Sequence, residues 1–398
     1  MSCPLSAIMD SMNSFKRHIS DRLEHVLSQG KSILLLGPRQ VGKTTALKAL
    51  TSDLYLNLMD PEVVMLYDRT PQQLRHEIQG LSTSKKPLVI IDEIQKCPHL
   101  TDLIQVLIDD QIAQFILCGS SVRKIKNLLP GRLVCLYMAP VMLTELPSIT
   151  PKISQLLLNG MLPEIIQKEG SPTDIDLRLK SYVITYLEEE IRKEALVRQI
   201  VPFSKFLRLS AIESGRLINF RKLATQIGIS HTTIAEYYRI LESCMVVERF
   251  DAYSESQTRR RLATTSKYIF FDLGVRRLAA EEGHQLPEEY MGHLFEQWVG
   301  LELRKELSLR SPLAKVTFWR DHNGPEIDWL IQDQDQLTPI EVKWTSTPSL
   351  RDAKHLELFL QEYSNAKEGF IICNTPKTLK LSSKITVLPW QKLQSLFG

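Results

Sequence analysis

Cysteine is scarce in this sequence of 398 residues, with six in all. They are scattered along the chain, at Cys3, Cys97, Cys118, Cys135, Cys244 and Cys373. No pair has the spacing of a zinc site or of a redox motif, so the sequence supports neither kind of centre. We expect free thiols in a reducing compartment.

Long apolar runs are missing as well. No segment approaches the ~20 apolar residues that a membrane-spanning helix needs. The opening MSCPLSAIMDSMNSFKRH lacks the apolar stretch of a signal peptide. Internal repeats and low-complexity tracts are not found either. The sequence therefore predicts a cytoplasmic protein without a membrane partner.

Neither sign of charge dominates, because 49 Lys and Arg residues face 46 Asp and Glu residues and leave a net charge of +3. This mild excess permits a nucleic-acid partner without requiring one. The length exceeds that of one ordinary core, so two or three domains are expected.

Short apolar runs alternate with helical patterns in the first third of the chain. The runs at 32–36, 88–91 and 115–118 are typical of buried parallel strands with crossover helices between them. They predict an α/β three-layer sandwich over residues 1–150. A helical linker (151–214), a winged-helix-like unit (215–280) and a second α/β domain (285–398) are expected to follow.

A complete G-x-x-x-x-G-K-[ST] motif follows the first strand pattern and opens a helical one, which is the context that a P-loop requires. Lys43 would act on the β- and γ-phosphates, and the Thr44 hydroxyl would bind Mg²⁺ beside backbone N–H groups that cradle the phosphates. The predicted ATP-binding residues are Gly37, Pro38, Arg39, Gln40, Val41, Gly42, Lys43, Thr44, Thr45 and Asp92.

Two acids end the second strand pattern, at Asp92 and Glu93. Ligands of open α/β sheets bind at the carboxyl ends of the strands. Asp92 is therefore expected to hold Mg²⁺, and Glu93 to polarise the water that attacks ATP. The pair favours hydrolysis of ATP to ADP and phosphate over transfer to a small molecule.

Two further residues are candidates for catalysis. Ser120 ends the third strand pattern, where it would sense the γ-phosphate or form a simple turn. Arg132 could contact phosphate from its own chain or from a neighbouring subunit, or be an ordinary surface arginine.

These motifs, in this order, resemble a large, mostly uncharacterised prokaryotic family of AAA-like P-loop ATPases. The matching segments are GPRQVGKTT (37–45), IDEIQKCP (91–98), CGSS (118–121), GRL (131–133), PVMLTEL (140–146) and GMLPEI (160–165). The family carries a C-terminal domain of unknown function with a PD-(D/E)XK nuclease-like fold. That part is matched by YVITYLEEEI (182–191), HLFEQWV (293–299), FWR (318–320), EIDWLI (326–331) and IEVKW (340–344).

A helix-turn-helix pattern lies in the middle of the chain. Asn219 caps a short helix that stops at Gly228, and Ser230 caps a second helix with a buried stripe of Ile234, Tyr238 and Leu241. Strand patterns then flank a basic loop. The candidate DNA-binding residues are Thr232, Thr233, Arg239, Arg259, Arg260 and Arg261.

Charge supports a DNA partner for this unit. Residues 201–275 hold 11 basic and 7 acidic residues, a net charge of +4, which exceeds that of the whole chain. The alternative is that the unit packs against protein, as a lid on the ATPase, and that its arginines are solvated.

Four residues of the C-terminal domain match the PD-(D/E)XK arrangement. Glu341 and Lys343 are two apart on one strand pattern and share a face, with Ile340 and Val342 on the buried face. Asp328 is on the preceding strand pattern and Glu296 on a helix. Glu296, Asp328 and Glu341 would hold a second Mg²⁺, with Lys343 acting on water. The alternative is an inert binding module.

Three functions are therefore open. The leading one is an ATP-hydrolysing switch or motor that acts on DNA or on a DNA-bound partner. The others are an ATP-gated, Mg²⁺-dependent nuclease and a regulatory signalling ATPase whose C-terminal half binds protein only. A homo-oligomer is compatible with each of them.

Overall fold

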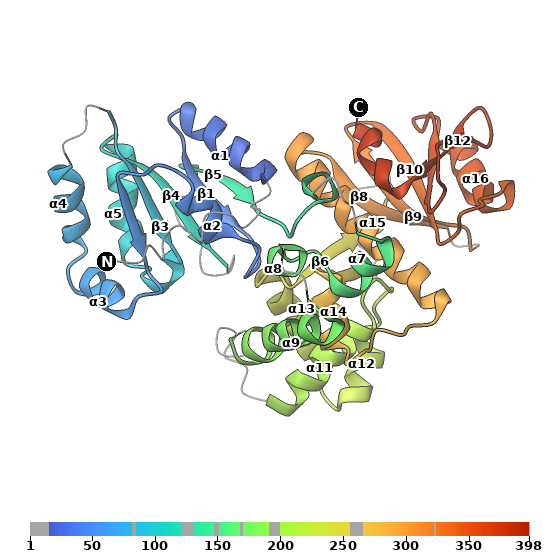
Figure 1. The fold of residues 1–398 in the computed structure, drawn as a ribbon, viewed down its shortest axis with the longest axis horizontal. Helices are drawn as coiled ribbons and strands as arrows, with labels where there is room; N and C mark the ends of the chain where they lie inside the picture. The colour runs from blue at the N-terminus through green and yellow to red at the C-terminus, as the bar shows by residue number, and fades with distance from the viewer. Residues whose placement is uncertain are drawn as a thin grey trace, which may run out of the picture. The chain divides into compact units, whose positions relative to one another are not determined.

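The structure is a computed structural model, and it describes residues 16–81, 85–120, 131–146, 151–167, 170–190, 200–254, 266–321 and 324–397. The chain divides into two compact units (Figure 1). The first comprises Met1–Val141, Leu162–Lys168 and Ser243–Met245, and the second comprises Met142–Met161, Glu169–Glu242 and Val246–Gly398.

The first unit is built on a five-stranded sheet in the order β2-β3-β4-β1-β5, and every pairing in it is parallel. The strands are β1 (Ser32–Leu36), β2 (Leu54–Asn57), β3 (Leu88–Asp92), β4 (Gln114–Gly119) and β5 (Leu133–Tyr137). The strand pattern of the sequence is confirmed, because the central residues of β1, β3 and β4 are buried as apolar runs.

Helices cover both faces of this sheet (Figure 1). They are α1 (His18–Ser28), α2 (Lys43–Lys48), α3 (Pro61–Arg69), α4 (Gln72–Gly80) and α5 (Leu100–Asp109). The unit also contains a short turn η1 (Ile94–Lys96) and the short helix α8 (Pro163–Gln167). Leu34, Ile91 and Leu117 face α3, α4 and α5 in one core. The first unit is thus a parallel α/β fold.

The second unit contains a six-stranded mixed sheet in the order β12-β13-β11-β10-β9-β8 and a two-stranded antiparallel sheet. The large sheet consists of β8 (Lys315–Arg320), β9 (Glu326–Asp333), β10 (Gln336–Lys343), β11 (Gly369–Cys373), β12 (Leu379–Lys380) and β13 (Ile385–Pro389). The small sheet pairs β6 (Val247–Asp251) with β7 (Ser266–Phe270).

The helices of this unit are α7 (Ile153–Asn159), α9 (Pro172–Tyr182), the π-helical η3 (Val183–Glu190), α11 (Ile200–Ile212), α12 (Phe220–Ile227), α13 (His231–Ser243), α14 (Leu273–Ala279), α15 (Glu288–Arg310) and α16 (Lys354–Glu362). Short turns are η2 (Leu143–Glu145), η5 (Leu350–Ala353) and η6 (Trp390–Phe397). Within the described residues, no helix is both long and apolar enough to cross a membrane.

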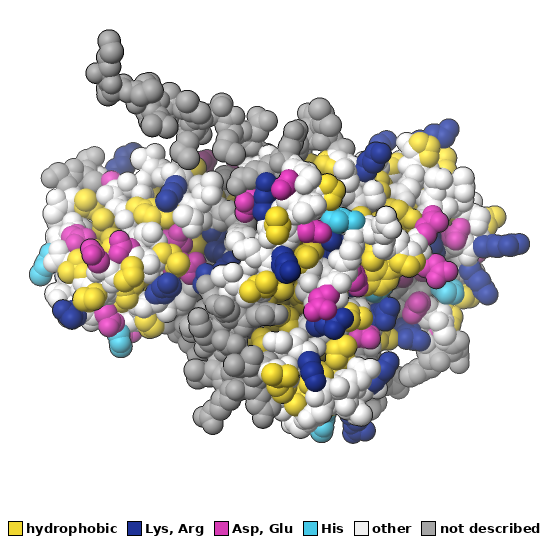
Figure 2. Space-filling view, turned by 60° about the horizontal axis from the view of Figure 1, so that its bottom comes forward, with side chains coloured by type: hydrophobic (Ala, Val, Ile, Leu, Met, Phe, Trp, Pro, Cys, Tyr) yellow, Lys and Arg dark blue, Asp and Glu magenta, His cyan; other side chains and the backbone are white. Residues whose placement is uncertain are grey.

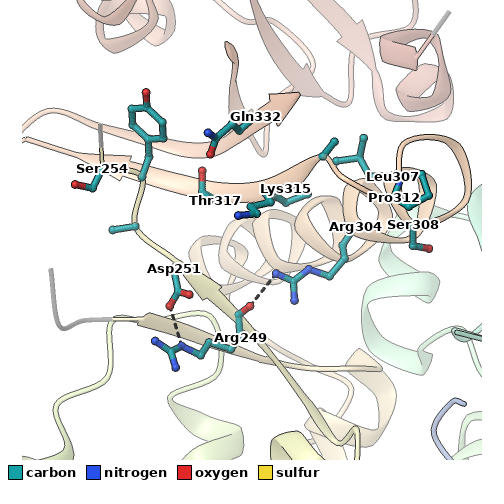
Figure 3. A pocket seen from close by; sticks show the side chains of 14 residues that line it. Arg249, Asp251, Ser254, Arg304, Leu307, Ser308, Pro312, Lys315, Thr317 and Gln332 are labelled. Carbon is teal, nitrogen blue, oxygen red and sulfur yellow. Dashed lines mark hydrogen bonds and ion pairs between the residues drawn. The ribbon is translucent and has the colours of Figure 1, made fainter. Parts of the chain in front are cut away.

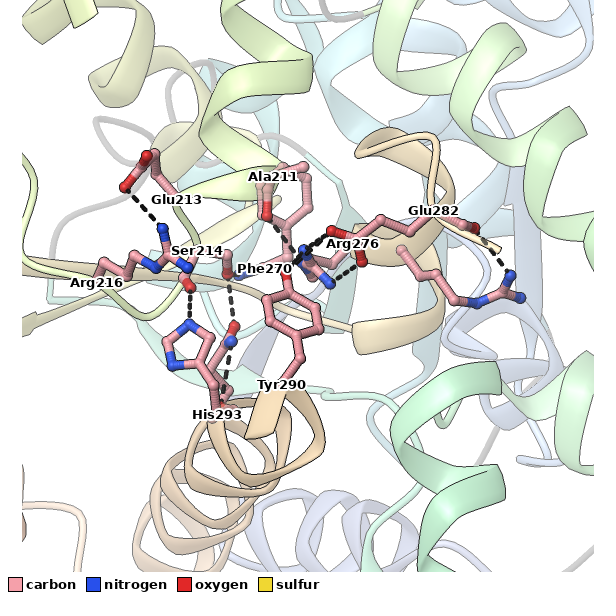
Figure 4. Close-up of polar contacts among 11 residues, drawn as sticks. Ala211, Glu213, Ser214, Arg216, Phe270, Arg276, Glu282, Tyr290 and His293 are labelled. Atoms are coloured by element: carbon pink, nitrogen blue, oxygen red, sulfur yellow. Dashed lines mark hydrogen bonds and ion pairs between the residues drawn. The ribbon is translucent and has the colours of Figure 1, made fainter. Parts of the chain in front are cut away.

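A polar network ties α11 and α14 to α15 (Figure 4). The fully buried guanidinium of Arg276 donates to the Ala211 carbonyl at 2.8 Å and forms two 2.6 Å hydrogen bonds with Glu282. His293 Nε2 lies 2.9 Å from the Ser214 carbonyl oxygen. These bonds fix the start of α15, the helix that carries Glu296.

Basic and acidic side chains are interspersed on the face seen in Figure 2. This mixture agrees with the near balance of charge in the sequence. The local excess of positive charge over 201–275 is therefore a property of that segment and not of the whole surface seen there.

Candidate functional site

The loop between β1 and α2 brings bare backbone close to its surroundings. Gly42 has a φ of 97° and directly precedes α2. A Cβ atom at Gly37 would lie 2.3 Å from the Met138 carbonyl oxygen, so only glycine fits there. Such a loop leaves its N–H groups accessible to phosphate oxygens.

Lys43 points back into this loop. Its Nζ donates to the carbonyls of Gly37 and Pro38, at 2.7 Å each, and the residue is 6% exposed. Burial lowers the pKa of Lys43, against the opposing effect of Glu93 and Asp92. A phosphate group in the loop would supply the negative charge that this buried ammonium lacks.

Asp92 lies at the carboxyl end of β3 and meets the first turn of α2. Its Oδ2 accepts hydrogen bonds from the Thr44 hydroxyl at 2.6 Å and from the Tyr55 hydroxyl at 3.0 Å. Its Oδ1 is buried and has no hydrogen-bond partner among the described residues. A hydroxyl beside a carboxylate with one unused oxygen is a ligand set that suits Mg²⁺. The residues therefore fit the nucleotide and ion that the motif implies.

Glu93 follows Asp92 in a left-handed conformation, with a φ of 58° that is unusual for a residue with a side chain. This conformation aims its carboxylate at Gln95, whose amide donates to it, and at Ser120, whose hydroxyl lies 3.4 Å away. Ser120 is 1% exposed at the end of β4. The structure thus brings Glu93 and Ser120 together.

Arg132 is not brought to the P-loop of its own chain. It precedes β5, whose first residue, Leu133, is registered opposite Ser32 at the start of β1. Since the two strands are parallel, Arg132 lies at the amino edge of the sheet, and the P-loop follows the carboxyl edge. There Arg132 forms a 2.7 Å ion pair with Asp109. The parallel topology therefore contradicts the expected contact between Arg132 and a phosphate bound to the same chain.

Three residues near the P-loop carried no prediction. Arg17 donates to the carbonyls of Val41 and Ala139, at 2.8 and 2.7 Å, and so links the P-loop to the residues after β5. Tyr55 contacts Asp92, and Gln95 contacts Glu93. Arg17 and Tyr55 lie outside any motif, whereas Gln95 belongs to the segment IDEIQKCP that carries the family resemblance.

The two helices of the helix-turn-helix pattern are present with the expected caps. Asn219 accepts from the N–H groups of Arg221 and Lys222, and Gly228 ends α12 with a φ of 82°. The Ser230 hydroxyl accepts from the Thr233 N–H at 3.1 Å. The expected stripe of α13 is confirmed, because all three of its residues are buried, namely Ile234, Tyr238 and Leu241.

The candidate DNA-binding side chains are partly engaged in local contacts. The hydroxyls of Thr232 and Thr233 lie 2.7 and 2.8 Å from the Ser230 hydroxyl. Arg239 is exposed and forms a 3.1 Å ion pair with Glu236 on the same helix. The expected basic loop, with Arg259, Arg260 and Arg261, falls outside the described residues.

The predicted acid-and-lysine quartet is brought into one group in the second unit. Asp328 Oδ2 accepts from the Val342 N–H at 2.8 Å, which places it beside β10. Lys343 Nζ donates to Glu341 Oε2 at 2.8 Å. Glu341 is only 2% exposed, although the sequence pattern had placed it on the face opposite the buried Ile340 and Val342. Both faces of β10 are therefore covered here.

The pairing of β9 with β8 contains a bulge beside Asp328. In the pairing with β8, Thr317 is opposite Leu330 and Trp319 is opposite Ile327, so β9 has one residue more than β8 over this stretch. The extra residue falls at Asp328 and Trp329. Ile327 and Trp329 are buried, whereas Glu326 is exposed and Asp328 half-buried, so Glu326 and Asp328 lie on one face of β9, and the charges of both act on Glu296 and Lys267.

Burial and the charge of Asp328 raise the pKa of the other two acids of the group. Burial, and next the charge of Asp328, raises the pKa of Glu296 to about 7. Burial and Asp328 also raise the pKa of Glu341 to about 9, against the opposing effect of Lys343. Like charges in a partly dry site disfavour full ionisation.

Lys267, on β7, joins the group and was not predicted. Its Nζ lies 2.7 Å from Glu296 Oε1. Burial alone would lower the pKa of Lys267. The charges of Glu296 and Asp328 oppose this effect and outweigh it, so the net shift of the pKa is upward. Within the described part of the chain, no set of three or more His, Cys, Asp or Glu side chains is arranged to hold a metal ion. The quartet is thus observed as an ion-pair network, and the expected second Mg²⁺ site does not fit its arrangement.

A separate cavity of about 550 Å³ lies where β6 approaches α15 and β8 (Figure 3). Its lining includes Arg249, Arg304 and Lys315 with one acid, Asp251. Arg249 Nε donates to Asp251 at 2.8 Å, and Arg304 Nη2 donates to the Arg249 carbonyl at 2.8 Å. The two arginines are therefore already used in internal contacts.

Comparison with known proteins divides the chain into three parts. Residues 29–146 match the AAA domain family, residues 150–285 match a domain of unknown function (DUF8612), and residues 291–393 match another (DUF4143). Two uncharacterized proteins, from Mycobacterium bovis and Mycobacterium tuberculosis, are each 25% identical over 341 residues, which cover 84% of this chain and 75% of the relative.

Solved structures show only distant similarity. The Pif1 helicase from Candida albicans matches with a TM-score of 0.24 and 11% identity, over 42% of this chain and 48% of the helicase, which is less than half of that protein. A DNA polymerase III gamma subunit-related protein from Thermotoga maritima matches with a TM-score of 0.24 and 11% identity, over 72% and 99% of the two chains. By its sequence matches, the chain carries a P-loop ATPase-like AAA domain at its N-terminal end and a DUF4143 domain in its C-terminal part.

Proposed function

We propose that this protein is an ATP-hydrolysing switch or motor that acts on DNA or on a DNA-bound partner. The observation that carries the proposal is the meeting of Lys43, Thr44, Asp92 and Glu93 at the carboxyl edge of one parallel sheet. An AAA domain match over the same residues supports it.

Each residue has a separate task in this proposal. The Lys43 ammonium leaves the loop carbonyls and faces the β- and γ-phosphates, where it offsets their charge. Thr44 and Asp92 would hold the Mg²⁺ that accompanies ATP, which would supply positive charge to offset that of the phosphates. Glu93 orients and polarises the attacking water, and Ser120 and Gln95 hold the Glu93 carboxylate in place.

The DNA part of the proposal rests on α13 and its surroundings. Thr232 and Arg239 are exposed on this helix, and the excess of positive charge over 201–275 favours a phosphate backbone. The grouping of Glu296 with Asp328, Glu341 and Lys343 also supports a PD-(D/E)XK nuclease-like fold for the C-terminal domain.

The test is the rate of ATP hydrolysis by the full chain, with and without double- and single-stranded DNA. Wild-type protein should hydrolyse ATP. In Lys43→Ala the rate of hydrolysis should fall about 10²-fold or more, because the main cation facing the phosphates is removed. Lys48→Ala is the matched control, since Lys48 is exposed in the last turn of the same helix.

DNA should raise the rate, and the effect should weaken as salt rises. Unchanged turnover in Lys43→Ala would refute the nucleotide site. Normal turnover without any response to DNA would instead favour the signalling ATPase that binds protein only.

A further inference from the structure

The acid cluster of the second unit already contains a cation from another part of the fold. Lys267 lies on β7, and its Nζ is 2.7 Å from Glu296 Oε1. The same Nζ is 5.1 Å from the ring centroids of both Phe318 and Trp329, a distance at which aromatic faces attract cations. Only 14% of the Lys267 side chain is exposed.

Each carboxylate of the cluster has one oxygen committed to a donor of the protein. Glu296 Oε1 is held by Lys267, Asp328 Oδ2 by the Val342 N–H, and Glu341 Oε2 by Lys343. Glu341 Oε1 is different, because it is buried and has no hydrogen-bond partner among the described residues, with His355 Nδ1 as an ion-pair neighbour 3.9 Å away. An unused oxygen of this kind is a place where a cation could bind if the site were open.

The charges of the cluster indicate what would make room for such a cation. Lys267 adds one positive charge to the cluster, in direct contact with Glu296 and within the influence of Asp328 and Glu326. Whatever the protonation of the acids, removing Lys267 makes the cluster more negative by one unit, which favours a divalent cation. Lys267 therefore competes for the charge that a metal ion would need.

Lys267 is also fixed by its backbone on both sides. It is registered opposite Phe250 in the β6–β7 pair, and on its other side it forms a bridge with Leu217. This pairing keeps the Lys267 backbone in place, and the ion pair with Glu296 and the two aromatic rings hold its ammonium.

We infer that Lys267 is the resident cation of this cluster and that it excludes divalent metal ions from the nuclease-like group of Glu296, Asp328 and Glu341. The cluster then holds the C-terminal domain together through ion pairs and does not act as a metal centre. This inference does not depend on ATP hydrolysis, because it concerns only groups of the second unit.

The experiment is a calorimetric titration of Mn²⁺ into the full chain without nucleotide. Wild-type protein and Asp328→Asn should give the same titration, because wild type should bind no Mn²⁺ at Asp328. Lys267→Met should bind one Mn²⁺ at least about tenfold more tightly, since a unit positive charge a few ångströms from the ion has been removed. Adding Asp328→Asn to Lys267→Met should abolish this binding.

Lys267→Arg is the matched control, because it keeps the positive charge and should bind Mn²⁺ as weakly as wild type. If Lys267→Met does not fold, Lys267→Gln serves the same purpose, since its amide can still donate to Glu296 without carrying a charge. The inference is overturned if wild type binds one Mn²⁺ and loses it in Asp328→Asn, or if the folded neutral variants bind no more tightly than wild type.

Discussion

The Thr44 hydroxyl donates a 2.6 Å hydrogen bond to Asp92 Oδ2, which joins the first turn of α2 to the end of β3. The two residues are far apart in the sequence, and they meet because β1 and β3 are parallel and end at the same edge of the sheet, with only β4 between them. The same oxygen of Asp92 also accepts from Tyr55, so the carboxylate is oriented from two sides.

Removing the Tyr55 hydroxyl should weaken Mg²⁺ binding more than it slows ATP hydrolysis at saturating Mg²⁺. In Tyr55→Phe the ring remains but Asp92 loses its 3.0 Å hydrogen bond. Partners that orient a ligand commonly change metal affinity by about 10-fold or more. We expect the Mg²⁺ concentration for half-maximal ATP hydrolysis to rise by roughly 3- to 10-fold.

Tyr67→Phe is the control for this change. Tyr67 also donates to a carboxylate, Glu77, at 2.6 Å, but it does so between α3 and α4. Its removal should leave the Mg²⁺ requirement unchanged. An equal shift in both variants would mean that general loosening of the unit, and not the orientation of Asp92, is being measured.

Glu93→Gln should separate ATP binding from hydrolysis. The amide keeps the shape of the side chain but removes the charge that polarises water, so hydrolysis should fall by roughly 10² or more with little loss of ATP affinity. Binding of a fluorescent ATP analogue and release of phosphate would be measured side by side. Glu62→Gln, an exposed change in the first turn of α3, should alter neither. Weakened ATP affinity with normal turnover at saturating ATP would show that Asp92 and Glu93 have exchanged roles.

The P-loop and the strands around it could be predicted because the signals are local. A glycine-rich loop between a strand and a helix needs no knowledge of distant contacts, and Lys43 and Thr44 follow from it. Asp92 followed from the end of a buried strand. The position of Arg132 required the direction of β5 as well, and the parallel pairing with β1 puts it at the opposite edge.

Long-range contacts explain what the sequence could not show. Lys267 reaches Glu296 from a strand of another sheet, and no spacing along the chain relates them. The bulge at Asp328 depends on the pairing of β9 with β8, which alternation alone does not reveal. Tyr55 belongs to no motif. Its contact with Asp92 depends on the pairing of β2 with β3, in which Asn57 lies opposite Asp92.

Gly160 offers a test of the packing inside the second unit. It has a φ of 78°, and a Cβ atom added there would lie 2.1 Å from Asp272 Oδ1. Asp272 is buried, accepts from the Met161 N–H at 2.6 Å and caps α14 through the Val275 N–H at 3.0 Å. Gly160→Ala must therefore displace a carboxylate that satisfies two backbone groups.

The expected cost of Gly160→Ala is at least about 3 kcal/mol in the free energy of unfolding, since overpacking adds to the cost of a left-handed backbone. Gly228→Ala is the matched control. Gly228 has a φ of 82°, but a Cβ atom there meets nothing within 4 Å, so only about 1 kcal/mol should be lost. Urea unfolding followed by tryptophan fluorescence reports on the second unit, because all five tryptophans lie in it. Equal losses in the two variants would show that Asp272 moves aside at little cost and that the contact does not hold the unit together.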